Sequence, residues 1–428
     1  MRHQIKIPLF LSFYLLLFLA IPGYGNAFQV MSLALIVMQN IATTLNARGN
    51  TSGSFKSNMS LLSIFLLGVI PLLSLANNFF NFEFYYVQYS ILFFLAMLSI
   101  YFTVSTIEFR IIFNSFVYAA ACITLTVLLT KTGLLRETLA ISYDPVNGLN
   151  RFDPYNLHPN LVGHIFGGFA VAFFCTMLYE KRKLRKFFFL GLVGVSFLFC
   201  IAASSRGGFL AGVLGIASVY SVAIWQDKVK RQYLMLFLVL GFVAFIATKG
   251  GDKLIAYLSS IFETGTGDRG VGSGLTGRTE NWDKLLHTVF SSVTFMLFGN
   301  GLRTGGSEVL GYDIDNSYLN LLYEIGLPCT TLLVMLIVSC TYRLHRSLVH
   351  APDSVKAAMV GMLVFILCES MVARYLLSIG NPVSLFIVFG MLGFRRLLKS
   401  APVHSVRSQH GSFQAEGEYL GLHQSVRL

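Results

Sequence analysis

Charged side chains are scarce in this 428-residue chain, in which Asp, Glu, Lys and Arg together make up only 12% of the residues. Soluble domains carry about 25% charged residues, so this chain has too few to cover a surface that faces water. The hydrophobic fraction of 55% also excludes an intrinsically disordered chain. The class that fits this composition is an all-helical, polytopic membrane protein.

Cysteine frameworks and metal-binding patterns are also lacking. The six cysteines lie inside apolar runs, which argues against a disulfide framework and against a zinc site. His158 and His164 are six residues apart, about 600° around a helix, so they point to different faces. The sequence contains no HExxH, Walker or CxxC pattern. We therefore expect neither a metal nor a cofactor.

Twelve apolar runs approach the length of about 20 residues that a membrane-spanning helix needs. The first run follows Arg2 and Lys6, which would also suit a signal peptide, but the later runs favour a retained helix. We expect an integral membrane domain over 1–399 and a polar cytoplasmic tail over 400–428. The runs cover 8–22, 28–45, 60–76, 86–104, 111–130, 161–179, 187–204, 208–226, 233–248, 317–342, 357–373 and 379–394.

Lysine and arginine predict the orientation of these spans, because the cytoplasmic loops of membrane proteins are enriched in both. With the N-terminus inside, the inner segments hold 21 of the 32 Lys and Arg residues. Both termini are therefore expected in the cytoplasm, with the long segments 131–160 and 249–316 on the outer face. Topology thus accounts for most of the basic excess, which argues against a nucleic-acid partner.

Arg206 and Arg374 stand alone at the outer ends of spans, against the topological preference. A cation at such a position is a candidate for function, although it can also snorkel to the interface or pair with a neighbour. For Arg374 we favour the second explanation, because Glu369 lies five residues before it. Glu324, inside the tenth span, is left open between a functional and a structural role.

The outer segment 249–316, between the ninth and tenth spans, is too long for a simple connector, and its length favours a functional role. Its glycine-rich stretch, 265–277, contains a GxGxxG match. No strand–helix unit surrounds this match, so a flexible loop is the better interpretation. Residues 285–298 fit an amphipathic helix that lies on the outer leaflet.

Polar residues gather in four clusters on the predicted outer face. Arg206, Arg278 and Arg303 offer planar guanidinium groups, which can bind phosphate oxygens through two hydrogen bonds at once. Asp315 offers a carboxylate that can act as a general base on a hydroxyl group. The clusters are 156–160, 204–208, 277–282, and 299–303 followed by 313–318.

The same clusters hold side chains that suit contacts with a sugar. A membrane face that joins arginines, a carboxylate and amides suits a lipid-linked phosphosugar. The alternative is that each arginine forms a structural ion pair, such as Arg278 with Glu280 or Asp283. The side chains expected to contact the glycan are Asn316, Tyr318, Trp282 and His158.

In their order along the chain, the clusters resemble the motifs of the O-antigen ligases and Wzy-type polymerases, a superfamily of bacterial inner-membrane proteins. The resemblance covers about 156–330, and the predicted topology agrees over the rest of the chain. The matching elements are Ser205-Arg206-Gly207, Gly277-Arg278 with Trp282, Gly299-Asn300-Gly301, and Asp315-Asn316 with Tyr318, Leu319 and Gly326.

The resemblance implies a metal-independent glycosyltransferase of the GT-C kind, which acts at the periplasmic face on glycans linked to undecaprenyl diphosphate. Arg206 and Arg278 would bind the diphosphate. Ligases of this superfamily usually carry a histidine where this chain has Asp315. That difference favours a polymerase of O-antigen, capsule or exopolysaccharide repeats, for which a chain-length regulator would be a partner. A ligase that transfers glycan to lipid A–core is the alternative.

A flippase or secondary transporter is a competing class, since twelve spans and interior acidic residues permit it. Transporters of this kind often show two related halves and helices that are broken near the middle of the membrane. The sequence shows no related halves, and its polar residues gather at one face. This asymmetry favours an enzyme that acts on one side of the membrane.

Overall fold

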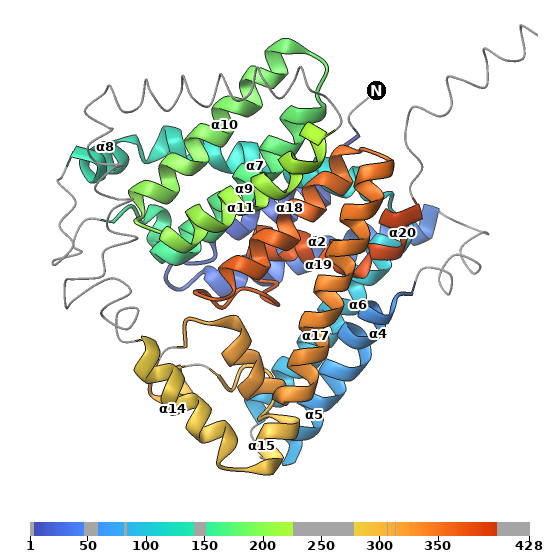
Figure 1. The fold of residues 1–428 in the computed structure, drawn as a ribbon, viewed down its shortest axis with the longest axis vertical. Coiled ribbons are helices and arrows are strands. Elements are labelled where there is room, and N and C mark those ends of the chain that lie inside the picture. Colours follow the sequence, from blue (N-terminus) through green and yellow to red (C-terminus); the bar gives the residue numbers. More distant parts are fainter. Residues whose placement is uncertain are drawn as a thin grey trace, which may run out of the picture.

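The computed structural model describes residues 4–46, 59–80, 84–140, 151–225 and 278–399, apart from 306 and 313. Every regular element within these ranges is a helix, and seven helical segments are long and apolar enough to cross a membrane. The protein is therefore an all-helical, polytopic membrane protein. Figure 1 shows the helices gathered into one bundle that narrows toward α14 and α15.

The long helical segments coincide with predicted runs. One of them is composite, since a π-helical stretch, η2, lies between α4 and α5 just before Pro71, which has no N–H to donate. The segments are α2 (Gly25–Asn46), α4–η2–α5 (Leu61–Ile64, Phe65–Val69 and Ile70–Phe80), α6 (Phe84–Thr106), α7 (Phe109–Thr130), α9 (Pro159–Tyr179), α10 (Lys183–Ala202) and α17 (Ser317–His350).

Four shorter apolar segments match further runs: α1 (Ile7–Leu15) with η1 (Leu16–Phe18), α11 (Arg206–Trp225), α18 (Ser354–Glu369) and α19 (Pro382–Leu392). The predicted run 233–248 lies outside the described residues, as do the stretch 265–277 and the tail 400–428. The count of twelve spans thus stays a prediction. The remaining elements are α8 (Thr132–Ala140), η3 (Pro154–Asn156), α14 (Arg278–Phe290), α15 (Val293–Phe298), α16 (Ser307–Leu310) and α20 (Phe394–Lys399).

Helix α9 lies at the centre of the bundle, with α10, α11 and α18 packed around it. Glycines allow α9 and α11 to touch through their backbones. A Cβ atom on Gly208 would fall 2.7 Å from the Gly163 Cα, and one on Gly167 would fall 2.5 Å from the Gly208 carbonyl oxygen. Such crossings of small residues are typical of membrane helices, which associate through close packing rather than through hydrophobic burial.

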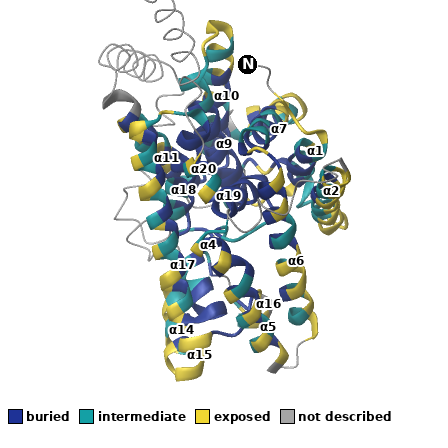
Figure 2. Ribbon diagram, turned by 90° about the vertical axis from the view of Figure 1, so that its right-hand side faces the viewer, coloured by how far each residue is buried: buried dark blue, intermediate teal, exposed yellow. Residues whose placement is uncertain are grey.

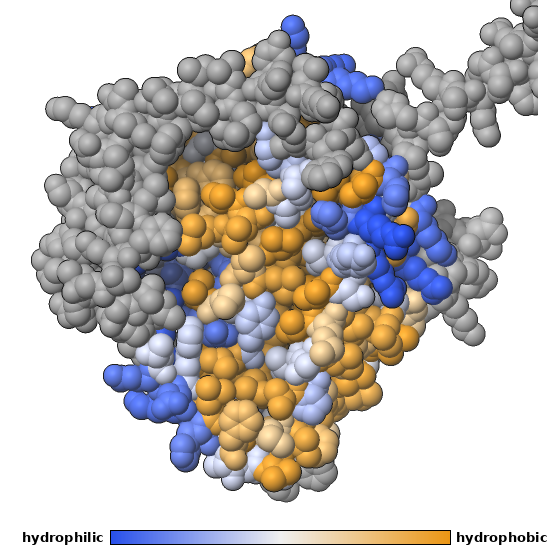
Figure 3. Space-filling view, viewed as in Figure 1, coloured by the Kyte–Doolittle hydropathy of each residue, from blue (hydrophilic) through white to orange (hydrophobic). Residues whose placement is uncertain are grey.

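The outward faces of the long helices are apolar. On α17, Leu332, Met335, Val338 and Tyr342 are between 43% and 65% exposed, and their spacing places them on one face. Figure 2 shows exposed residues along α2 and α6, and Figure 3 shows hydrophobic residues across one side of the bundle. An apolar surface of this extent is expected to face lipid.

Polar contacts group the described loops into two ends. At one end, Arg110 pairs with Asp353, and Arg395 Nη1 donates to the Met59 carbonyl oxygen at 3.1 Å. At the other, Asn77 Nδ2 donates to the Phe298 carbonyl oxygen at 2.7 Å. We refer to the second end, which carries α14 and α15, as the α14 end. The grouping fits the predicted alternation of inner and outer loops, while the side that faces the cytoplasm stays a prediction.

The segment predicted as one amphipathic helix over 285–298 is divided in the structure. Helix α14 ends at Phe290 and α15 begins at Val293, after a short turn. The apolar side chains of Phe290, Val293 and Phe298 are 55%, 69% and 49% exposed. An apolar face is therefore present, but two short helices carry it.

Candidate functional site

Arg278 and Asp315, two of the predicted site residues, form an ion pair at the α14 end. Arg278 Nη2 lies 3.0 Å from Asp315 Oδ2, and the two side chains are 25% and 29% exposed. Arg278 is the first residue of α14, and Asp315 directly precedes the N-cap residue of α17. The third and fourth sequence clusters therefore meet. The structural alternative was an ion pair between each arginine and a carboxylate, and Arg278 does form one, with Asp315 rather than with Glu280 or Asp283.

Asn316 and Tyr318 hold the first turn of α17 in place. Asn316 Oδ1 accepts hydrogen bonds from the N–H groups of Tyr318 (2.9 Å) and Leu319 (3.1 Å), which makes it an N-cap. Asn316 Nδ2 donates to the Met371 carbonyl oxygen at 3.0 Å. The Tyr318 hydroxyl donates to the Leu367 carbonyl oxygen at 2.5 Å. Both side chains thus have structural partners, and their contact with a glycan stays a prediction.

The turn at 370–373, which follows α18, links the second cluster to the fourth. The backbone N–H of Ser317 donates to two carbonyl oxygens of this turn, at 2.8 and 3.1 Å. The same turn contacts α11, because a Cβ on Gly207 would fall 2.5 Å from Val372 Cγ2. Arg206, the first residue of α11, therefore lies beside the turn that holds the start of α17.

Helix α17 is broken near the α14 end. Gly326 has φ 78° and ψ 166°, a conformation that glycine alone adopts readily. Pro328 has no N–H, so it cannot donate to the Glu324 carbonyl oxygen four residues earlier. The break therefore leaves the carbonyl oxygens of Tyr323 and Glu324 without their helical donors.

The Gly-Asn-Gly element at 299–301 fills this break. The N–H groups of Asn300 and Gly301 donate to the two freed carbonyl oxygens, at 2.8 and 2.7 Å. A Cβ on Gly299 would fall 2.5 Å from the Glu324 backbone, so only glycine allows the loop to approach this closely. Non-helical backbone of this kind is tolerated in a membrane protein where protein groups satisfy it.

Arg303 follows this loop and is held by two neighbours. Its backbone N–H donates to Glu324 Oε1 at 2.8 Å, and its φ of 74° lies in the left-handed region. The guanidinium carbon lies 5.0 Å from the centre of the Tyr89 ring, and Nη2 donates to the Tyr89 hydroxyl at 3.3 Å. A non-glycine residue in this conformation is uncommon and often marks a functional position.

A cavity of about 520 Å³ lies beside Arg303 at the α14 end. This volume is in the range of pockets that bind small molecules. Its wall joins α2 and α6 to the start of α17 and to the chain before α19. Its polar and charged lining residues include Gln29, Tyr89, Arg303, Ser317, Glu324 and Arg374.

Asp315 lies within electrostatic reach of this cavity. Ser317, two residues later, and Tyr375 both line it. Burial raises the pKa of the Tyr375 hydroxyl, and the negative charges of Glu369 and Asp315 raise it further. The Arg278–Asp315 pair is therefore joined to the cavity wall through the first residues of α17.

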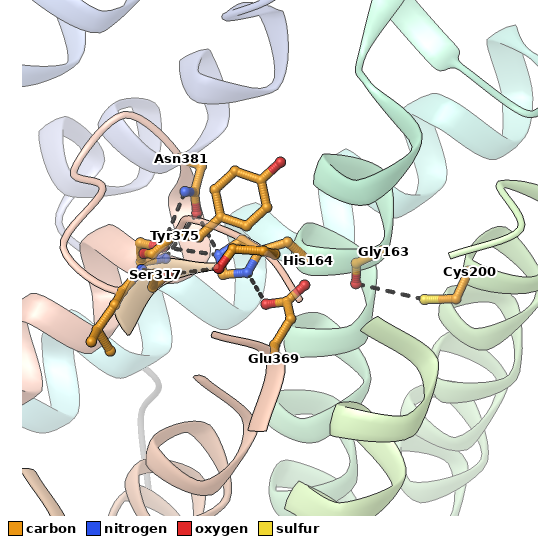
Figure 4. A network of polar contacts seen from close by, with 10 residues as sticks. Gly163, His164, Cys200, Ser317, Glu369, Tyr375 and Asn381 are labelled. Atoms are coloured by element: carbon orange, nitrogen blue, oxygen red, sulfur yellow. Dashed lines mark hydrogen bonds and ion pairs between the residues drawn. The ribbon is translucent and has the colours of Figure 1, made fainter. Parts of the chain in front are cut away.

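A buried polar network lies behind this wall (Figure 4). His164 Nδ1 is bonded to Glu369 Oε2, and its Nε2 lies 3.0 Å from Asn381 Oδ1 and 2.9 Å from Ser384 Oγ. These four residues are at most 2% exposed. The Tyr375 ring lies 4.6 Å from the His164 ring. The network thus joins α9, α18 and α19 directly beneath a residue of the cavity wall.

This network was not predicted from the sequence. His164 was assessed there only as a metal ligand, and Glu369 as a neighbour for Arg374. In the structure Glu369 binds His164, and Arg374 lines the cavity. The signal that could have indicated the network is that His164 and Glu369 are ionisable residues within predicted spans. Such residues are usually paired in the interior of a membrane protein.

His158 and Trp282, the other predicted glycan contacts, occupy different settings. His158 is the N-cap residue of α9, and its Nδ1 accepts a hydrogen bond from the Asn160 N–H at 3.3 Å. Trp282 packs against a small apolar cluster that includes Leu285 and Tyr323. Within the described ranges, Trp282 Nε1 is buried without a hydrogen-bond partner. Their contact with a glycan stays a prediction.

The geometry gathers guanidinium groups and two carboxylates, Glu324 and Asp315, near one cavity. Arg303 and Arg374 line it, and Arg278 is linked to it through Asp315 at the start of α17. Arg206 lies beside the turn at 370–373, which directly precedes Arg374. In the described part of the chain, no three His, Cys, Asp or Glu side chains are placed to hold a metal ion. No protein-family model matches this chain, and no curated protein matches it either.

Proposed function

We propose that this protein transfers glycans from a polyprenyl diphosphate carrier at the α14 end. The observation that carries the proposal is the Arg278–Asp315 pair beside a cavity that Arg303 lines. Guanidinium groups suit the diphosphate of such a carrier, and a carboxylate suits the activation of an acceptor hydroxyl. The apolar surface of the bundle suits substrates that reside in lipid.

In the proposed reaction, the acceptor hydroxyl oxygen forms a bond to the anomeric carbon of the donor glycan. The bond from that carbon to the diphosphate oxygen breaks, and the polyprenyl diphosphate leaves with the electron pair. Asp315 accepts the hydroxyl proton. Arg206, Arg278 and Arg303 stabilise the negative charge that grows on the leaving diphosphate.

Among transferases of this kind we favour a polymerase of undecaprenyl-diphosphate-linked repeats, at the periplasmic face of a bacterial inner membrane. Asp315 supports this choice. Ligases of the superfamily whose motifs this chain resembles usually carry a histidine at the position that matches Asp315. The position of Arg278, Asp315 and Arg303 at one end supports transfer over transport, since a transporter needs polar groups along a path through the membrane.

The test is deletion of the gene in its own host, followed by electrophoresis of lipopolysaccharide and of surface glycans. A polymerase predicts that core capped by one repeat accumulates, or that secreted polymer disappears. Complementation with Asp315→Asn should fail, whereas Asp353→Asn, at the opposite end, should restore the glycan. Bare core with accumulated lipid-linked polymer would identify a ligase instead, and unchanged glycans would overturn both.

A further inference from the structure

The buried His164–Glu369 pair lies between the segments that carry two of the predicted site residues, Arg206 and Asp315. His164 directly follows Gly163, where a Cβ would fall 1.8 Å from Ser205 Oγ. Ser205 in turn directly precedes Arg206 at the start of α11. Because this contact leaves no free space between α9 and α11, the position of the pair is tied to that of Arg206.

On its other side, the pair adjoins the turn that holds the start of α17. Glu369 directly precedes this turn, at 370–373. Carbonyl oxygens of the turn accept hydrogen bonds from the side chains of Asn316, at 3.0 Å, and Ser317, at 2.6 Å. These two residues directly follow Asp315, so the position of the pair is tied to that of Asp315 as well.

The hydrogen bonds around the His164 ring fix where its protons lie (Figure 4). Asn381 Oδ1 accepts from the Ser384 N–H at 2.9 Å, and the Ser384 hydroxyl donates to the Tyr375 carbonyl oxygen at 2.7 Å. Both groups therefore meet His164 Nε2 as acceptors, so Nε2 carries a hydrogen. The bond from Nδ1 to Glu369 requires one further proton, and the pair has no net charge whichever atom holds it.

An apolar pair could fill the same space, since replacing a buried ion pair by apolar residues of similar volume is often neutral or stabilising. What the polar pair adds is direction, because each hydrogen bond fixes a distance and an angle. We propose that His164 and Glu369 are positioning residues. They fix the start of α11 relative to the start of α17, and so set the distance between Arg206 and Asp315.

For its effect on the reaction, this inference rests on the proposed glycan transfer. There Arg206 stabilises the leaving diphosphate and Asp315 accepts the proton of the acceptor, so their separation has to match the substrates. A displacement of about 1 Å between reacting groups can lower a rate about 100-fold. The mechanical coupling of α11 to α17 stands without the reaction and can be measured separately.

Hydrogen–deuterium exchange of the full-length protein in lipid nanodiscs measures this coupling. The informative amides are those of Ser317 and Leu376, because their hydrogen bonds join the start of α17 to the chain after α18. His164→Leu with Glu369→Leu removes the network and leaves no charge buried. Glu369→Gln keeps a bond, since the amide can donate to the ring. Ser63→Ala, which removes a buried hydrogen bond between α4 and α19, is the matched control.

We expect exchange at Ser317 and Leu376 to be at least about tenfold faster in the double variant, because the opening of this segment then costs less free energy. Glu369→Gln and Ser63→Ala should exchange at these amides as the wild type does. A wild-type rate in the double variant would overturn the proposal. If that variant does not fold, Ser384→Ala removes the bond to the Tyr375 carbonyl oxygen without changing a buried charge, and its exchange at Leu376 is judged in the same way.

Glycan assembly, per amount of folded protein, should fall at least about tenfold in the double variant and stay near the wild-type level in Glu369→Gln. A pair that only stabilises the fold predicts instead that assembly follows the unfolding temperature across all variants, and that result would overturn a positioning role. Unchanged surface glycans after gene deletion would overturn the transfer reaction alone and leave the exchange result standing, so the two failures are distinguishable.

Discussion

The guanidinium group of Arg278 lies 3.0 Å from the carboxylate of Asp315 and joins the start of α14 to the start of α17. Both side chains are partly exposed, at 25% and 29%. Ion pairs in such settings contribute about 1 kcal/mol or less to stability. The pair therefore adds little to stability, and the proposed function assigns it a role in binding and proton transfer.

Arg278→Ala should abolish long-chain glycan while it changes the stability of the purified protein by about 1 kcal/mol or less. The physical reason is that the guanidinium group binds a charged substrate, whereas the exposed pair adds little to folding. Glycan electrophoresis and thermal unfolding in detergent measure the two effects. The exchange Arg278→Asp with Asp315→Arg restores an ion pair but should not restore the glycan. If the exchanged protein were active, the pair would be structural.

Asp315→Asn should impair glycan assembly severely, because the amide keeps the size of the side chain but cannot accept a proton. Asp315→Glu should retain part of the activity, since it keeps the carboxylate at a shifted position. Asp353→Asn removes a carboxylate that pairs with Arg110 at the other end, and it serves as the control. Full activity of Asp315→Asn would move the base to another residue.

His164→Leu should destabilise the protein by about 3–5 kcal/mol, because it leaves the buried Glu369 carboxylate without its partner. The double change His164→Leu with Glu369→Leu should recover part of this loss, since no charge is then left buried. Thermal unfolding in detergent measures both. If the double variant were no more stable than the single one, the pair would not be the source of the effect.

Gly326→Ala should cost about 1–3 kcal/mol or more, because Gly326 has a positive φ and an added Cβ would meet the Leu297 backbone. Gly191→Ala, on α10, is the matched control, since a Cβ there meets nothing within 4 Å. That change should be neutral or stabilise by about 0.5–1 kcal/mol. Equal unfolding temperatures for the two variants would contradict the account of the break in α17.

Hydropathy predicts most helices of this protein because a bilayer requires long apolar segments whose backbone bonds are satisfied internally. Helix α9, at Pro159–Tyr179, matches the predicted run 161–179 closely. Hydropathy does not predict where a helix is interrupted. The break in α17 depends on Gly326 and on the loop that fills it, and these come together only in the folded chain.

For the candidate site, the sequence likewise predicted where residues lie along the chain but not which of them come into contact. The sequence placed Arg278 and Asp315 on one face of the membrane, because both lie in outer segments of the predicted topology. It could not indicate that they would pair, since that depends on how α14 packs against α17. The hydrogen bond between His164 and Glu369 could not be predicted either, because it depends on how α9 packs against α18.

The direct contact of α9 and α11 at Gly163 and Gly208 has a consequence for the depth of Arg206. Two backbones in contact leave no side chain between them whose rotamer could change their spacing. A membrane helix responds to a thinner or thicker bilayer chiefly by tilting. Here α9 and α11 must tilt as one body, so bilayer thickness would shift Arg206 and the N-cap of α9 together without changing the distance between them.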